Sequence, residues 1–296
     1  MTEELLPPTE AVDDATHELD RLSTSDLVEL LVSQQRRAVD AVRSAVPQIA
    51  QAVEAIASRL AGGGTLHYVG AGTSGRLGIL DAAEAPPTFG TPPSLVRAHI
   101  AGGLAAVVAA VEGAEDDAGA AERMQAEWRR DDALIGISAS GGAKFVIAAV
   151  ERARSAGAYT VALTSAARSQ LATVADLAIV LETGAEPLAG STRMLAGTAQ
   201  KIALNAISTA TMVRLGKTYG NLMVDLVATN DKLRRRAMRL VSEVGMVDPA
   251  RAGELLSAAG GSVKVAIVMA RRNLDAAGAR DALSASGGRL RAVLED

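Results

Sequence analysis

Between residues 65 and 215 the sequence alternates short apolar runs with longer segments in which apolar residues recur every three or four positions. The runs have the length and β-branched content of buried strands, at 65–69, 95–100, 133–138, 159–163 and 177–181. Helical periodicity fills the intervals, at 75–83, 116–129, 143–156 and 193–215. This alternation is typical of a parallel sheet covered on both faces. We therefore predict an α/β fold, a three-layer α/β/α sandwich around a five-stranded parallel sheet.

The segments on either side of this region carry helical patterns without strand signals. Apolar residues from 27 to 56 recur at helical spacing, and so do those in 231–241, 250–258, 262–271 and from 274 onward. We predict an N-terminal helical segment over 1–60 that packs on the core, and the α/β domain over 61–230. Residues 231–296 are expected to form a small C-terminal bundle of about three helices.

Composition disfavours several classes of partner. Only 2% of the 296 residues are aromatic and the net charge is −4, so neither base stacking nor a basic nucleic-acid surface is expected. The chain has no cysteine, and its three histidines, at 17, 67 and 99, have no ligand spacing, so we predict no metal site and no cofactor. No basic leader or uninterrupted apolar span is present, and we expect a cytoplasmic protein without a membrane partner.

Two loops at predicted strand ends are suited to an anion. After the first strand come Gly70, Gly72 and Gly75, with the hydroxyls of Thr73 and Ser74 between them. The glycines satisfy the dinucleotide-binding pattern, but no acidic residue follows where a ribose would need it, so a small phosphate ester fits better than NAD.

The second loop, Ser138-Ala-Ser-Gly-Gly, leaves the third strand and enters a helix, and its Ser138, Ser140 and Gly141 form a candidate phosphate seat. Ligands of such folds bind outside the carboxyl ends of the strands, where these two loops are expected to meet.

A third polar cluster stands where the helix of residues 193–215 should begin. Ser191 and Thr192 are candidate ligand contacts, although Ser191 is equally suited to capping that helix. Lys201 and Asn205 lie four residues apart on one helical face, and both are candidates to point into the crevice.

Glu84 is the carboxylate best placed for acid/base chemistry. It stands at the predicted end of the first sandwich helix, where the helix dipole disfavours an ionised carboxylate, and this suits a proton donor. An unbroken helix from Ser74 would, however, separate the two residues by about 15 Å. Either the helix breaks early, or Glu84 acts on a ligand held mainly by a neighbouring subunit.

Several motifs together resemble the N-acetylmuramic acid 6-phosphate etherase family, built on the sugar isomerase (SIS) domain. The most specific is Glu-Ala-Pro-Pro-Thr-Phe-Gly, which begins at Glu84. The others lie at 70–78, 111–117, 190–194, 196–201 and 216–225, and the likeness covers most of residues 65–230.

The resemblance implies a cofactor-free cleavage of the lactyl ether of N-acetylmuramate 6-phosphate, giving N-acetylglucosamine 6-phosphate and D-lactate by elimination and water addition. It implies that Glu84 is the proton donor and Glu115 the second active-site glutamate. The positions that match the family's phosphate and sugar contacts are Gly72, Thr73, Ser74, Ser138 and Ser140. We expect a small sugar phosphate as ligand and a homodimer with a shared active site.

Two other functions remain open on the same fold. The animal glucokinase regulatory protein shares the domain, which makes a sugar-phosphate-binding regulator an alternative, although such a regulator carries two of these domains and this chain has room for one. An aldose-ketose isomerase is the other, but the string that begins at Glu84 is not typical of isomerases. This chain departs from the etherase pattern in 142–145, where a hydroxyl is missing and Lys144 is a candidate replacement, and at Leu195, where a lysine is usual.

Overall fold

The computed structural model describes residues 7–124, 128–226 and 231–295. A sheet of five parallel strands lies at its centre, in the order β2-β1-β3-β4-β5. The strands are β1 (Leu66–Gly70), β2 (Val96–Ile100), β3 (Ala133–Ile137), β4 (Tyr159–Thr164) and β5 (Leu177–Val180). Each predicted strand is confirmed to within one residue at either end. Every residue of β1 and β3 is buried, as expected for strands inside a sheet that is covered on both faces.

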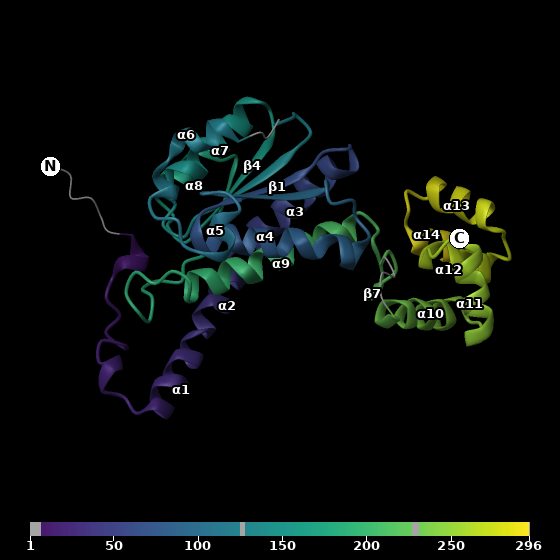
Figure 1. The fold of residues 1–296 in the computed structure, drawn as a ribbon, viewed down its shortest axis with the longest axis horizontal. Coiled ribbons are helices and arrows are strands. Elements are labelled where there is room, and N and C mark those ends of the chain that lie inside the picture. The colour runs from purple at the N-terminus through teal and green to yellow at the C-terminus, as the bar shows by residue number, and fades with distance from the viewer. Residues whose placement is uncertain (1–6, 125–127, 227–230, 296) are drawn as a thin grey trace. The chain divides into compact units, whose positions relative to one another are not determined.

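Helices cover both faces of the sheet (Figure 1). One face carries α6 (Ala118–Arg123), α7 (Lys144–Ser155) and α8 (Gln170–Val174); the other carries α3 (Val46–Ala61), α4 (Gly72–Phe89) and α9 (Leu195–Arg214). The core between α7 and the sheet is aliphatic, and includes Leu134, Val146 and Val150. The predicted three-layer sandwich is confirmed.

Two of the predicted helices have different lengths in the structure. The pattern over 116–129 forms only α6, which begins after Asp117 because the Asp117 side chain accepts a hydrogen bond from the backbone of Ala120; residues 125–127 lie outside the described part of the chain. The helix predicted to end at residue 83 instead continues through Pro86 and Pro87 to Phe89.

The remaining elements lie before, within and after the α/β region of the chain. Helices α1 (Thr24–Gln34) and α2 (Arg36–Ser44) precede α3, and the short α5 (Ala105–Val108) follows β2. Three 3-10 turns span Pro8–Glu10, Leu19–Arg21 and Ala114–Asp116. An antiparallel pair that the sequence did not suggest, β6 (Thr218–Tyr219) and β7 (Leu222–Met223), follows α9.

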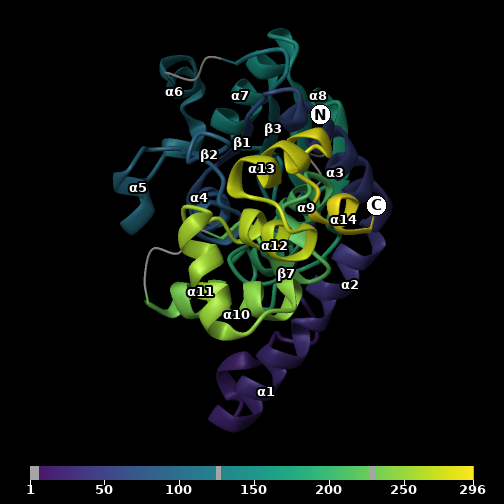
Figure 2. The same cartoon turned by 90° about the vertical axis from the view of Figure 1, so that its right-hand side faces the viewer.

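The C-terminal helices gather in one cluster in both views (Figures 1 and 2). They are α10 (Asp231–Gly245), α11 (Pro249–Ala258), α12 (Val263–Arg272), α13 (Ala276–Ala285) and α14 (Leu290–Glu295). The described residues therefore form five short helices here rather than about three, because the glycine pairs at 260–261 and 287–288 adopt positive φ and interrupt the helical backbone. Their shared core includes Leu240, Ile267 and Leu290.

Backbone contacts divide the chain into two compact units. One comprises residues 1–82 and 95–208, and the other residues 83–94 and 209–296, so α4 and α9 each run from the first unit into the second. The division predicted at residues 60 and 230 remains a prediction. In the described part of the chain no single helix is long and apolar enough to span a membrane, and α11 and α12 meet that criterion only as a pair bent by 115°.

Candidate active site

The loop after β1 is a tight turn that leads directly into α4. A Cβ atom on Gly70 would lie 2.6 Å from the backbone nitrogen of Gly75, and one on Gly75 would lie 2.6 Å from the Cγ1 atom of Ile100. Only glycine fits at either position, and Gly72 has a φ of +50°. The turn places Thr73 and Ser74 in the first helical turn of α4, where Thr73 is half-buried and Ser74 is buried.

Helix α9 packs against this loop. The Ser74 hydroxyl donates a hydrogen bond of 2.9 Å to Oε1 of Gln200, and a Cβ atom on Gly197 would lie 3.4 Å from the Thr73 methyl group. Lys201 is exposed on α9. Asn205 donates a hydrogen bond to Asp81 of α4 at 2.6 Å, so its amide N–H is already engaged within the chain.

The N-terminus of α9 is capped by a carboxylate rather than by a serine. Both oxygens of Glu186, which is fully buried, accept hydrogen bonds from the backbone of Leu195 and Ala196, at 2.7 and 2.9 Å. Burial raises the pKa of Glu186, and these two hydrogen bonds act in the opposite direction. The helix begins four residues after Ser191, which leaves the half-buried hydroxyls of Ser191 and Thr192 without a capping role.

The loop after β3 is ordered by its own serines. Ser138 Oγ accepts a hydrogen bond from the backbone of Gly141 at 3.1 Å, and Ser140 Oγ accepts one from Gly142 at 3.2 Å. Gly141 has a φ of +67°, and a Cβ atom there would lie 2.2 Å from the Ser169 hydroxyl. The loop therefore packs against the segment that follows β4, and α7 begins directly after it at Lys144, preceded by the N-cap residue Ala143, whose side chain makes no capping hydrogen bond.

A cavity of about 620 Å³ opens beside this loop at the carboxyl ends of β3, β4 and β5. Ser140, Gly141 and Gly142 line it together with residues that sequence reasoning missed, Ser165, Arg168, Ser169 and Glu182 among them. Ser165 is buried, and its hydroxyl has no hydrogen-bond partner within the described residues. The signal that was available is position, because residues 165–169 follow β4 at the sheet edge where ligands of such folds bind.

Lys144, the candidate cation beside the loop, forms an ion pair with Asp116. Its ammonium group lies 3.5 Å from the Asp116 carboxylate, and both side chains are exposed. Arg168 is the cationic residue that lines the cavity itself.

The two candidate acid/base carboxylates are both exposed in the single chain. Glu84 lies within α4, five residues before the helix ends, and Glu115 lies in the 3-10 turn Ala114–Asp116. The expectation that Glu84 sits at a helix C-terminus is therefore wrong, because α4 continues past it.

Titratable clusters elsewhere do not involve these residues. His67, which stands alone in the sequence, lies with its Nδ1 atom 3.0 Å from Nε2 of His99, and Trp128 packs edge-on against both rings. Among the residues described, no three His, Cys, Asp or Glu side chains are grouped to hold a metal ion.

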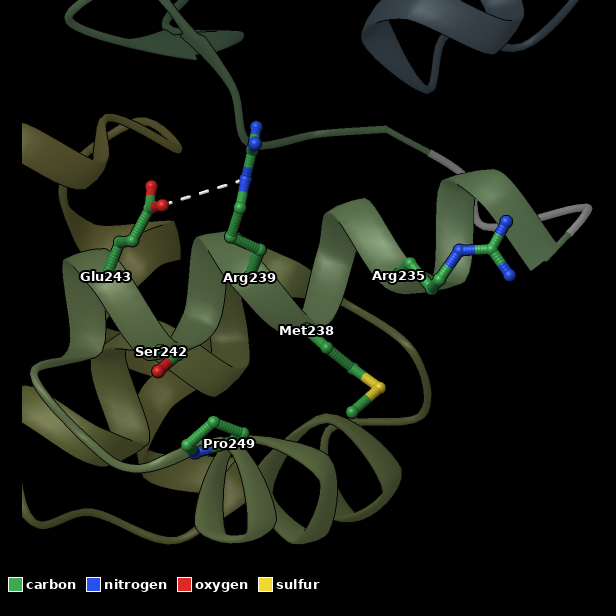
Figure 3. Close-up of a pocket in the computed structure, with 6 residues that line it drawn as sticks. All are labelled: Arg235, Met238, Arg239, Ser242, Glu243 and Pro249. Carbon is green, nitrogen blue, oxygen red and sulfur yellow. Dashed lines mark ion pairs between the residues drawn. The ribbon is translucent and has the colours of Figure 1, made fainter.

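A second hollow, of about 400 Å³, lies on the C-terminal helices (Figure 3). It is lined by Arg235, Met238, Arg239, Ser242, Glu243 and Pro249. Arg239 and Glu243 form an ion pair of 3.6 Å on α10, and Figure 3 shows them turned away from Pro249. None of the predicted site residues lines this hollow, so the candidate site is the one at the strand ends.

The fold and the polar strand-end loops define a SIS-domain protein. A glucokinase regulatory protein N-terminal SIS domain matches residues 48–154 and a SIS domain matches residues 105–210. A phosphoheptose isomerase from Francisella tularensis superimposes with a TM-score of 0.50 over 64% of this chain and 98% of its own, and at 21% identity this likeness shows the fold alone.

Relatives of nearly the same length identify the family. The N-acetylmuramic acid 6-phosphate etherase of Gloeobacter violaceus is 50% identical over 97% of this chain and 94% of its own. The enzyme of Symbiobacterium thermophilum is 53% identical over 85% of this chain and 84% of its own. The enzyme of Cutibacterium acnes is 46% identical over 98% of this chain and 96% of its own. The chain belongs to the N-acetylmuramic acid 6-phosphate etherase family. It is therefore a carbon-oxygen lyase with etherase activity. Because the near-full-length relatives are etherases, this family takes precedence over the regulator and isomerase alternatives.

Proposed function

We propose that Glu84 and Glu115 carry the proton transfers of the etherase reaction, and that the loops after β1 and β3 hold the sugar phosphate. In the open-chain aldehyde, carbon 2 is acidic because its carbanion delocalises into the carbonyl group. A base removes that proton, and lactate leaves from carbon 3 as its ether oxygen takes a proton from an acid. Water then adds at carbon 3: the deprotonated acid takes one proton from the water, and the protonated base returns its proton to carbon 2, so both groups regain their starting state.

These steps need one group that accepts a proton and one that donates it, and a pair of carboxylates can do both. We assign the donor role to Glu84 and the opposite proton transfer to Glu115. Support comes from the family motifs that contain both residues and from their exposure, which leaves both accessible to a substrate.

The phosphate end of the substrate is assigned to the cavity beside the β3 loop. Ser140, Gly141 and the uncapped start of α7 supply hydroxyl and backbone N–H groups, and Arg168 supplies positive charge. Ser138 supports this loop through Gly141. Gly72, Thr73, Ser74, Ser191, Thr192 and Lys201 are assigned to the sugar and its lactyl group.

We further propose that two copies of the chain share each active site. Helix α4 is continuous from Gly72 to Phe89, so the early break that would bring Glu84 close to its own loop does not occur. Twelve residues of helix separate Gly72 from Glu84 by about 18 Å, which is longer than one small sugar phosphate. A second copy is the simplest source of a carboxylate near each phosphate seat.

Release of D-lactate from N-acetylmuramate 6-phosphate tests the activity in this chain. To test sharing, Glu84→Gln chains and chains that carry both Ser140→Ala and Gly142→Ala are purified separately and then mixed. If sites are shared, one site of each mixed dimer is intact and part of the activity returns. Mixtures of each variant with itself serve as controls. No recovery in mixtures in which an affinity tag on one variant captures the other would contradict sharing.

The ligand also suggests where the chain works. A sugar phosphate carries charge and does not cross a bilayer unaided, so we place the chain in the cytoplasm. Fractionation of source cells, followed by detection with an antibody, tests this assignment.

A further inference from the structure

Gln200 is a buried amide with only one of its two polar ends satisfied. Its side chain lies on α9 with 1% exposure, and its Oε1 atom accepts the hydrogen bond from Ser74. Its Nε2 atom is buried and has no hydrogen-bond partner within the residues described. Buried polar atoms without partners are rare because leaving one unpaired is costly.

The Ser74 proton is committed to Gln200 in this arrangement. A hydroxyl group has one proton and two acceptor lone pairs. With that proton directed at Gln200 Oε1, Ser74 Oγ can offer only lone pairs to a ligand. The side chain of Ser74 is itself buried, so few other orientations are open to its proton.

We infer that Gln200 is a positioning residue that makes Ser74 a hydrogen-bond acceptor toward the sugar. This rests on the proposed function, in which Ser74 contacts the sugar end of the substrate. Ser74 Oγ would accept a hydrogen bond from a sugar hydroxyl or from the acetamido N–H, since both of these groups donate. One polar atom of Gln200 is unpaired in either orientation of the amide, because turning it over would direct Nε2 at Ser74 and leave Oε1 without a partner; the structure has the orientation in which Ser74 donates.

A double-mutant cycle between Ser74 and Gln200 tests the inference. Ser74→Ala is expected to raise KM about tenfold with kcat within twofold, because the lost contact is one to bound substrate. Gln200→Met keeps the length of the side chain and removes the acceptor, and should raise KM to a similar degree. The double variant should be no worse than Ser74→Ala alone within twofold, because Gln200 acts only through Ser74.

Thr198 provides a matched control. Its hydroxyl, also on α9, donates to Gln35 Oε1 at the same distance of 2.9 Å. Gln35→Met removes an equivalent hydroxyl–amide bond and should leave KM unchanged. Gln200→Glu keeps an acceptor for the Ser74 proton and should recover most of the affinity lost in Gln200→Met.

Independent, multiplying effects of Ser74→Ala and Gln200→Met on KM would overturn the inference, and so would a loss in Gln200→Glu equal to that in Gln200→Met. Melting temperatures establish that each variant folds, and Gln200→Asn, which is too short to reach Ser74, replaces Gln200→Met if that variant does not. Wild-type chains that release no D-lactate would contradict the proposed function instead, so the two failures are distinguishable.

Discussion

Glu84 and Glu115 are exposed carboxylates whose assignment comes from motifs and from the chemistry of elimination. Exposure alone does not distinguish them from their neighbours, since Glu112 is exposed two residues before Ala114–Asp116. The effect of each substitution on substrate turnover must therefore distinguish the catalytic glutamates from Glu112.

Replacing either glutamate with glutamine should abolish most turnover. A general acid or base contributes roughly 10²- to 10⁴-fold, so kcat for D-lactate release should fall by at least about 10²-fold in Glu84→Gln and in Glu115→Gln, with folding unchanged. Glu112→Gln is the matched control and should keep wild-type kcat. Wild-type turnover in Glu84→Gln would remove that residue from the mechanism.

Arg168 should contribute affinity rather than rate. It lines the cavity beside Ser140, whereas Lys144 pairs with Asp116. Arg168→Gln should raise KM for the phosphorylated substrate about fivefold with kcat nearly unchanged, because a partly solvated charge pair is worth about 1 kcal/mol. Lys144→Gln should leave KM within twofold. Equal effects of the two variants would contradict this role for Arg168.

At the scale of elements, helix α4 is longer than local rules allow. Proline supplies no N–H group, so Pro86 and Pro87 cannot bond the carbonyls of Ala82 and Ala83 within the helix. The helix nevertheless continues, and Ala85 and Phe89 on its last turns are buried. Burial of these side chains in the folded chain compensates for the two missing hydrogen bonds.

Strands β1 and β2 together create a histidine pair that neither contains alone. Burial lowers the pKa of His67 from 6.5 to about 4; the neighbouring His99, Arg97 and Arg129 act in the same direction and Asp132 opposes them. Burial likewise lowers the pKa of His99. Both rings are therefore neutral in the folded chain at neutral pH.

Acid should destabilise the protein through this pair. Because the pKa of His67 is lower in the folded chain, the unfolded chain binds more protons between pH 6.5 and about 4, and folding stability falls as pH is lowered through that range. His67 contributes about 3 kcal/mol to the free energy of unfolding at neutral pH, and this contribution is lost in acid. Urea unfolding at several pH values should show a shallower decline in His67→Gln than in wild type. His17→Gln, which changes an exposed histidine, should retain the wild-type slope.

At the scale of the whole molecule, the second compact unit is held together by a buried lysine. In the second unit the buried Lys264 donates to the carbonyls of Gly216 and Gly288, both at 2.8 Å, and to the Asp225 carboxylate at 2.7 Å. Burial lowers the pKa of Lys264, and Asp225 opposes that effect. The lysine thus joins the segment around β6 and β7 to the C-terminal helices.

Lys264→Met should destabilise the second unit by about 3 kcal/mol, because it leaves the Asp225 carboxylate and two carbonyls without this donor. Lys217 offers a comparison, since its ammonium group also lies near Asp225, at 3.3 Å, but is more exposed. Lys217→Met should cost about 1 kcal/mol or less. Urea unfolding of both variants measures the difference, and equal losses would contradict a special role for Lys264.

The sequence by itself determined the sandwich, the strand boundaries, the two polar, glycine-containing loops at the strand ends and the family, because strand and helix periodicity and local motifs are properties of neighbouring residues. Only the tertiary structure decided that α4 passes Pro86, that Glu186 caps α9 and that Arg168 lines the cavity. Each of these depends on residues brought together from separate elements, and local propensity carries no information about such contacts. The same reason explains why the pairing of Gln200 with Ser74 could not be anticipated.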